Sequence, residues 1–213
     1  MSKKPVNIER AIEVTREFMD MTPFRFIDYF ICGSIRRGKQ TVGDVDLIIT
    51  EDFPKDGDAQ KYKESGGEKS QTFNYKDVQI NMWKCEPNQL GGFILYATGS
   101  GSFGKALRSL AIDNDYKLSQ YGLFNRKTDK LIESTSEKKI FNKLGLKWIP
   151  PIHRDKKLKA LYRAYKLTSI NDESFESRLL GRIEDKKKYP EELWAILPIV
   201  IPVGLLKDFI KGR

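Results

Sequence analysis

Two aspartates, Asp44 and Asp46, stand one residue apart directly before the apolar run Leu47-Ile48-Ile49. The run predicts a buried strand, and side chains two residues apart on a strand project from the same face. Two carboxylates held side by side repel each other unless a cation neutralises them, and carboxylate oxygens are ligands that Mg²⁺ binds. The pair therefore predicts a divalent-cation site at the start of a buried strand.

The segment just upstream carries groups that bind phosphates. It contains a glycine turn, a hydroxyl and two guanidinium groups, in the order Gly33, Ser34, Arg36, Arg37, Gly38. Guanidinium groups bind phosphate oxygens through paired hydrogen bonds, and successive backbone N–H groups of a turn form an anion-binding concavity. Together with the aspartate pair, this segment predicts a metal-dependent nucleotidyl-transfer site.

Composition limits the partners and the compartment. The 213 residues allow one domain or two small ones, and a net charge of +9 is compatible with a polyanionic partner or with a lysine-rich solvated surface. Cys32 and Cys85 are too few for a disulfide framework and are typical of reduced core residues. The N-terminus shows no secretory signal, and Pro198 and Pro202 interrupt an apolar stretch too short to span a membrane. We expect an intracellular, cytoplasmic, soluble protein (in the host cytoplasm if it is viral).

Periodicity and turn residues predict an α+β fold. Helices are expected over 7–19, 102–114 and 137–144, the last ending at a glycine. Strands are expected over 45–50 and 72–83, a strand or last helical turn over 26–32, a hairpin over 116–132 and a solvated loop over 54–70.

Several motifs occur in the order seen in family X DNA polymerases. They are the 33–38 segment, Gly43-Asp44-Val45-Asp46, Tyr96-Ala97-Thr98-Gly99-Ser100, and the stretches 118–124 and 148–151. Over about 25–154 the chain resembles this polymerase beta-like family, and within it the minimal viral and microbial members that have only a palm and a thumb. The resemblance implies a nucleotidyltransferase palm over 1–90, with a mixed β-sheet and flanking helices, and a small α+β thumb over 91–153.

The resemblance also implies roles for the metal and nucleotide ligands. Asp44 and Asp46 would bridge two Mg²⁺ ions, with Mn²⁺ as an alternative. Ser34 and Arg37 would hold the β- and γ-phosphates, beside Gly33 and the backbone of Gly43.

Further along the chain, the resemblance implies contacts with the sugar and the DNA. Tyr96 and Gly99 would lie against the sugar of the incoming nucleotide. Lys105 and Arg108, three residues apart on one helix face, would contact the template base and the minor groove.

One catalytic position departs from the family pattern. The family's third carboxylate, which helps bind the catalytic metal and accepts the primer proton, falls on Asn81. An amide oxygen ligates weakly and cannot take a proton. Two interpretations stay open: Asn81 is an engineered isosteric replacement that traps substrates, or it is native to a slow or repurposed nucleotidyltransferase.

Two further departures concern the nucleotide pocket. Ala97 replaces an aromatic residue usual in the family, and Gly104 stands where the family often has a base-contacting asparagine. Both changes enlarge the pocket floor. We therefore expect weak sugar discrimination and modest fidelity.

The last sixty residues, 154–213, are basic and are expected to be helical. They could form a module that grips duplex DNA or the 5′-phosphate of a gap, or a helical cover packed on the thumb.

The sequence thus predicts a monomeric DNA polymerase without membrane contact, which adds deoxynucleotides from triphosphates to a primer 3′ end in gapped or primer–template DNA. This is repair synthesis by a two-metal mechanism. Template-independent or RNA-directed nucleotidyl transfer, and a catalytically weak gap-DNA-binding protein, are the alternatives.

Overall fold

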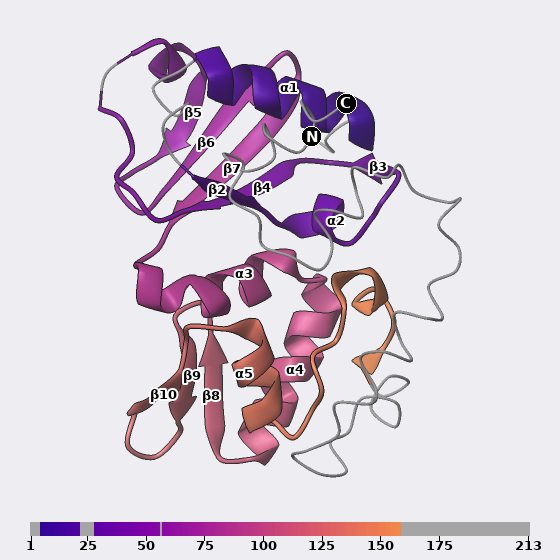
Figure 1. The fold of residues 1–213 in the computed structure, drawn as a ribbon, viewed down its shortest axis with the longest axis vertical. Coiled ribbons are helices and arrows are strands. Elements are labelled where there is room, and N and C mark those ends of the chain that lie inside the picture. Colours follow the sequence, from indigo (N-terminus) through magenta and orange to yellow (C-terminus); the bar gives the residue numbers. More distant parts are fainter. Residues whose placement is uncertain (1–4, 22–27, 56, 159–213) are drawn as a thin grey trace, which may run out of the picture.

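The computed structural model describes residues 5–21, 28–55 and 57–158. Figure 1 shows two layered parts, one built on a five-stranded sheet and the other on helices and a three-stranded sheet. Residues 159–213, which make up most of the expected helical extension, lie outside the described residues, so this extension stays a prediction. Within the described ranges, no helix is long and apolar enough to cross a membrane.

The first part is a mixed sheet with the spatial order β2-β4-β7-β6-β5. Its strands are β2 (Tyr29–Ile31), β4 (Val45–Ile49), β5 (Lys63–Gly66), β6 (Ser70–Tyr75) and β7 (Val78–Lys84). Only the central pair β4 and β7 is parallel, and the other neighbours are antiparallel. A short pair, β1 (Val6–Asn7) and β3 (Thr41–Val42), lies beside it.

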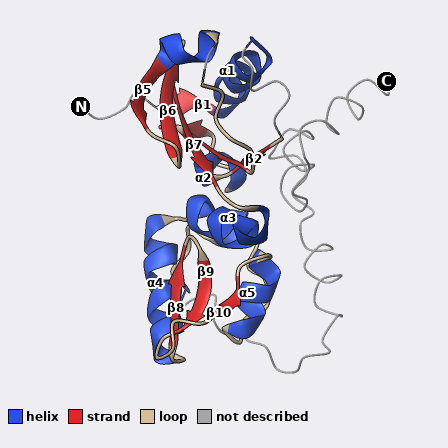
Figure 2. Ribbon diagram, turned by 90° about the vertical axis from the view of Figure 1, so that its left-hand side faces the viewer, coloured by secondary structure: helices blue, strands red, loops and turns tan. Residues whose placement is uncertain are grey.

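Helix α1 (Ile8–Met21) packs on one face of this sheet (Figure 2). Its residues Ile8, Ala11, Val14 and Phe18 recur at helical spacing, and each is buried. They pack against alternate residues of the two central strands, since only one side of each strand faces the helix. These strand residues are Val45, Leu47 and Ile49 of β4 and Val78, Ile80 and Met82 of β7.

The opposite face of the sheet contacts α3 (Leu90–Thr98). Ile48 packs there with Cys32, Cys85 and Phe93. Both cysteines are free and buried, which confirms the prediction of reduced core residues. Burial raises the pKa of Cys32 to about 12 and that of Cys85 to about 11, so neither thiol ionises at neutral pH.

The second part packs α3, α4 and α5 around a three-stranded antiparallel sheet with the order β10-β9-β8. Its elements are α4 (Gly101–Asp113), β8 (Tyr116–Ser119), β9 (Gly122–Asn125), β10 (Leu131–Glu133) and α5 (Glu137–Lys143). The expected helices over 102–114 and 137–144 are confirmed. Ser100 caps α4, since its Oγ accepts a hydrogen bond from the Phe103 backbone N–H.

Two predictions for the first part were wrong. The expected loop over 54–70 contains a 3₁₀ helix, η2 (Asp58–Tyr62), and the edge strand β5. Because β5 is largely exposed, it shows no apolar alternation, and its pairing with β6 holds it in place. The single strand expected over 72–83 is a hairpin, in which Lys76 and Asp77 adopt positive φ angles of 47° and 63°.

A buried ion cluster joins the two parts. Glu137, at the start of α5, accepts a bidentate pair of hydrogen bonds from Arg36 at 3.0 and 2.7 Å and another from Arg154 at 2.7 Å. Arg36 also donates to the Thr98 hydroxyl at 2.7 Å. Arg154 has no exposed surface, and Arg36 and Glu137 are only 6% and 7% exposed. The cluster therefore fixes the position of α5 relative to the sheet.

Charge pairing determines the protonation of Glu137. Burial alone raises the pKa of this carboxyl, but the charges of Arg154 and Arg36 outweigh burial and hold the pKa well below its usual range. A carboxyl with a depressed pKa in the folded state stabilises the protein above its unfolded-state pKa. That stabilisation is lost as the pH falls below the usual range of a glutamate and toward the folded-state value.

We expect Glu137→Gln to lower the free energy of unfolding by about 3–5 kcal/mol at neutral pH, because it leaves two buried guanidinium charges without a counter-charge. Urea unfolding followed by circular dichroism measures this change. Asp129→Asn, which breaks the exposed pair with Lys117, is the matched control and should leave stability unchanged. Equal stability of the wild type and Glu137→Gln would contradict the role assigned to the cluster.

Candidate active site

The pairing of β4 with β7 brings the predicted catalytic residues together. Asp46 lies directly opposite Asn81 in the parallel register, and Asp44 stands two residues before Asp46. All three therefore project from the same face of the sheet. This is the face opposite α1, because the neighbouring Val45 and Leu47 belong to the core beneath that helix.

Asn81 joins the two aspartates through its amide nitrogen. Its Nδ2 donates to Asp44 Oδ2 and to Asp46 Oδ1, both at 3.2 Å. Its Oδ1 accepts from Gln79 Nε2 at 2.7 Å and from Thr72 Oγ1 at 3.3 Å. The amide thus turns its donor end toward the carboxylates, and its oxygen would have to rotate inward to act as a ligand.

The donor set fits a divalent cation. One carboxylate oxygen from each aspartate converges on a single nitrogen, which places two hard, anionic ligands around one point. Across the described ranges no group of three His, Cys, Asp or Glu side chains forms a fuller metal site. The predicted acidic ligands are therefore Asp44 and Asp46, with the Asn81 amide between them.

Gly33 lies against the carboxylate of Asp46. It begins the short helix α2 (Gly33–Arg36) with a φ angle of +60°. A Cβ atom at this position would stand 2.1 Å from Asp46 Oδ2, well inside contact distance. The backbone also connects the two segments, since the N–H of Cys32 donates to the carbonyl of Asp46 at 2.7 Å. Glycine at 33 therefore lets the predicted phosphate-binding segment approach the predicted metal ligand Asp46.

Arg37 extends from the end of α2 toward the second part of the molecule. Its Nη1 donates to the carbonyl of Thr98, and its Nε donates to Asp155 Oδ1 at 3.1 Å. A Cβ atom at Gly99 would stand 3.4 Å from Arg37 Nη1, so these two predicted nucleotide ligands are neighbours. Ser34 is half-buried within α2.

Gly43 is exposed and directly precedes Asp44. A Cβ atom at Gly43 would meet nothing within 4 Å, so the space around it is open. The role of its backbone beside the phosphates stays a prediction.

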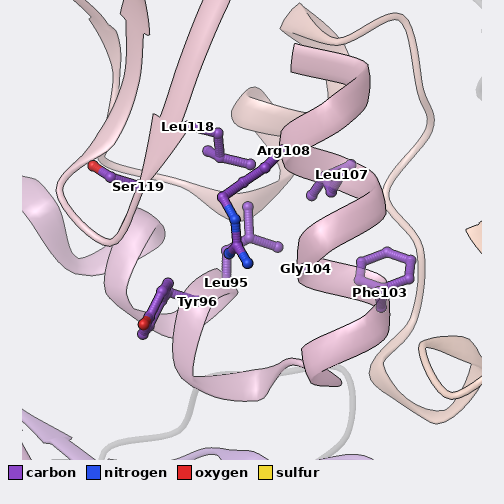
Figure 3. A pocket seen from close by; sticks show the side chains of 8 residues that line it. All are labelled: Leu95, Tyr96, Phe103, Gly104, Leu107, Arg108, Leu118 and Ser119. Carbon is purple, nitrogen blue, oxygen red and sulfur yellow. The ribbon is translucent and has the colours of Figure 1, made fainter. Parts of the chain in front are cut away.

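A second group of predicted residues lies around a pocket between α3, α4 and β8. Tyr96 is 53% exposed at its edge. Figure 3 shows the Arg108 side chain reaching from α4 into the pocket, between Tyr96 and Gly104. A Cβ atom at Gly104 would lie 3.4 Å from Arg108 Nη1, so the guanidinium occupies the space beside the glycine. Lys105 is exposed on the same helix.

Four residues near the site were missed by the sequence analysis. Gln79 and Thr72 donate to the oxygen of the Asn81 amide, while Asp155 pairs with both Arg37 and Lys39. Gln79 could have been found, because it alternates with Asn81 on one strand. Asp155 carries no local signal, since it is 118 residues from Arg37 in sequence.

Two family descriptions match this chain. "DNA polymerase beta palm" matches residues 7–73, and "DNA polymerase beta thumb" matches residues 93–155. The palm match contains α2 and both aspartates, and the thumb match contains the pocket around Tyr96 and the buried Glu137.

Relatives among characterised proteins carry polymerase names. The "Repair DNA polymerase X" of African swine fever virus (isolate Tick/Malawi/Lil 20-1/1983) is 28% identical, over 57% of this chain and 78% of its own length. The "DNA polymerase/3'-5' exonuclease PolX" of Bacillus subtilis is 27% identical, over 68% of this chain and 28% of its own. "DNA polymerase IV" of Saccharomyces cerevisiae is 35% identical over 77 residues. The chain spans only 13–28% of the length of three such relatives, the third being rat "DNA polymerase lambda".

Solved structures support the same fold. A "Ternary P/T complex" of Leishmania infantum polymerase beta superposes with a TM-score of 0.59 at 23% identity, covering 73% of this chain and 78% of that one. The predicted α+β palm-and-thumb architecture is therefore confirmed. Because the two consecutive family descriptions together match more than half of the chain and the fold agrees with them, this chain belongs to the polymerase beta family, the family X DNA polymerases.

Proposed function

We propose that this chain is a small repair DNA polymerase that adds deoxynucleotides to a primer 3′ end in gapped DNA. The observation that carries the proposal is the convergence of Asp44 and Asp46 beside Gly33 and the phosphate-binding segment. The viral relative is named a repair polymerase, and a solved polymerase beta is titled a "Ternary gap complex". Gapped or primer–template DNA and a deoxynucleoside triphosphate are the proposed partners, and a monomer is the proposed state.

The proposed residue roles follow the geometry. Asp44 and Asp46 hold two divalent cations, Mg²⁺ or Mn²⁺, which when bound neutralise charge on the triphosphate. Ser34, Arg37 and the Gly43 backbone bind its terminal phosphates. These groups orient the nucleotide for in-line attack, the main contribution a protein makes to phosphoryl transfer.

The thumb supplies the remaining contacts of the proposal. The exposed ring of Tyr96 and the backbone of Gly99 lie against the sugar, and Lys105 and Arg108 on α4 contact the DNA. In this arrangement residues 1–90 act as the palm, 91–153 as the thumb and 154–213 as a basic extension.

Asn81 limits this chemistry. It carries no charge and cannot accept a proton, and its amide spans the two aspartates as a hydrogen-bond donor. We infer that it preserves the spacing of the carboxylates and that the primer hydroxyl loses its proton to water. This single residue favours a second candidate function, a catalytically weak protein that binds gapped DNA.

We expect Asn81→Asp to increase single-nucleotide incorporation by about 10²–10⁴-fold, the usual contribution of a positioned general base. Primer extension on gapped DNA, with and without a template strand, measures this gain and separates templated from template-independent transfer. Asn125→Asp is the control, because it adds the same charge in a turn of the thumb. An aspartate there can still accept the hydrogen bonds from the backbone N–H groups of Lys127 and Thr128, so incorporation should stay unchanged. If both the wild type and Asn81→Asp bind gapped DNA tightly and neither incorporates a nucleotide, the result would favour the second candidate function, a protein that only binds gapped DNA.

We expect Gly33→Ala to displace the Asp46 carboxylate and lower incorporation by about 10²-fold, as small misplacements of catalytic groups do. Mn²⁺ titration followed by electron paramagnetic resonance should show weakened binding in the absence of nucleotide. Gly67→Ala is the control, because a Cβ atom there meets nothing within 4 Å. Unchanged Mn²⁺ affinity in Gly33→Ala would refute the proposed cation site.

We expect the preference for deoxynucleotides over ribonucleotides to stay below about a thousandfold, which is near 4 kcal/mol. Ala97 packs against the core cluster that contains Cys32 and Phe93, and at this position the chain offers no aromatic ring to exclude a 2′-hydroxyl. Single-turnover incorporation of matched deoxy- and ribonucleotides measures the ratio. A larger ratio would show that other groups, such as Tyr96, exclude the 2′-hydroxyl.

A further inference from the structure

We propose that Arg37 and Lys39 together form a binding site for the terminal phosphates of the nucleotide. In the absence of nucleotide, the carboxylate of Asp155 occupies this site in place of a phosphate. This inference rests on the proposed function, because it specifies how the nucleotide's triphosphate is bound. Neither Lys39 nor Asp155 belongs to the motifs that identified the site.

The contacts of Asp155 resemble those of a phosphate. Its Oδ1 accepts from Arg37 Nε at 3.1 Å, and its Oδ2 lies 2.7 Å from Lys39 Nζ. Each carboxylate oxygen thus pairs with a different cation. Guanidinium and ammonium groups bind carboxylate and phosphate oxygens in the same way, so two oxygens of one phosphate could replace the two of Asp155.

The limited exposure of the Arg37 side chain means that a phosphate and the Asp155 carboxylate would compete for it. The Arg37 side chain is only 14% exposed, and its Nη1 is already used by the Thr98 carbonyl. A phosphate that pairs with the Nε edge of Arg37 must therefore displace Asp155. Displacement is feasible because Asp155 and Lys39 are 30% and 47% exposed, so the released carboxylate can turn into solvent.

The backbone of Asp155 is held in place by its neighbour. Arg154 is fully buried, donates to Glu137 at 2.7 Å and to the Ile149 carbonyl at 2.9 Å, and packs against Phe103 and Phe141. The side chain of Asp155 can leave the cations while its Cα stays beside them. Asp155 therefore competes with phosphate for Arg37 and Lys39 as a tethered group. Its effective concentration at the site is set by the fold and not by the protein concentration.

Charge explains why this arrangement suits a polymerase. Without nucleotide, the Asp155 carboxylate offsets one of the two positive charges of Arg37 and Lys39, which weakens the attraction of other anions to them. A triphosphate carries several charges against one, so it can displace Asp155, whereas weaker anions cannot. Asp155 thus lowers the apparent affinity of the site for every anion by the same factor, so that only an anion that binds strongly occupies the site at ordinary concentrations.

We expect Asp155→Asn to bind inorganic tripolyphosphate about 3- to 10-fold more tightly than the wild type, the range that one or two part-exposed ion pairs represent. Isothermal titration calorimetry of the full chain, without DNA or metal, measures this. Lys39→Gln in either background should weaken binding, and the gain should shrink at high salt. Asp129→Asn removes the same charge from an exposed ion pair in the thumb and should behave as the wild type.

The outcomes separate the two proposals. Equal or weaker tripolyphosphate binding by Asp155→Asn overturns the competition and makes Asp155 a positioning residue for Arg37. Binding by neither the wild type nor Asp155→Asn overturns this inference together with the proposed phosphate site. Tighter binding by Asp155→Asn but also by Asp129→Asn would show a general charge effect and overturn the assignment to Asp155.

Discussion

Among the described residues, the charged contacts between palm and thumb depend on one buried carboxylate, that of Glu137. Glu137 fixes Arg36 and Arg154, so the residues that follow them, Arg37 and Asp155, are brought face to face at the edge of the site. The contacts of Glu137 with Arg36 and Arg154 are buried, whereas those of Asp155 with Arg37 and Lys39 are partly exposed, and we propose that a phosphate replaces Asp155 there. The buried Glu137 cluster thus positions the partly exposed pairs of Asp155, and in this way the packing of palm and thumb is connected to the proposed phosphate site.

In the region of the proposed metal ligands, the register of the backbone pairing places the side chains. The parallel pairing of β4 with β7 sets Asn81 beside Asp46, and the glycine at 33 lets α2 approach the same carboxylate. Within this geometry Asn81 is uncharged, and its amide nitrogen donates hydrogen bonds to both aspartates. A neutral donor between two carboxylates stabilises the pair, yet it cannot perform the proton transfer that a third carboxylate would.

The fold could be predicted where apolar spacing was strong. Helices α1, α4 and α5 and the buried strand β4 were expected within a few residues of their observed limits. The polar edge strand β5 was missed because its hydrogen-bond partners lie on β6 and its side chains face solvent. The β6–β7 hairpin was read as one strand because Lys76 and Asp77, in its turn, are not glycine.

The sequence by itself determined the family, the aspartate pair and the glycine turn, because these are short motifs whose chemistry depends on adjacent residues. It also determined that position 81 is an amide. Only the tertiary structure decided which way that amide points, that Arg108 fills the space beside Gly104, and that Asp155 lies on Arg37 and Lys39. These contacts join residues far apart in the chain, so they arise only when the palm and thumb pack together.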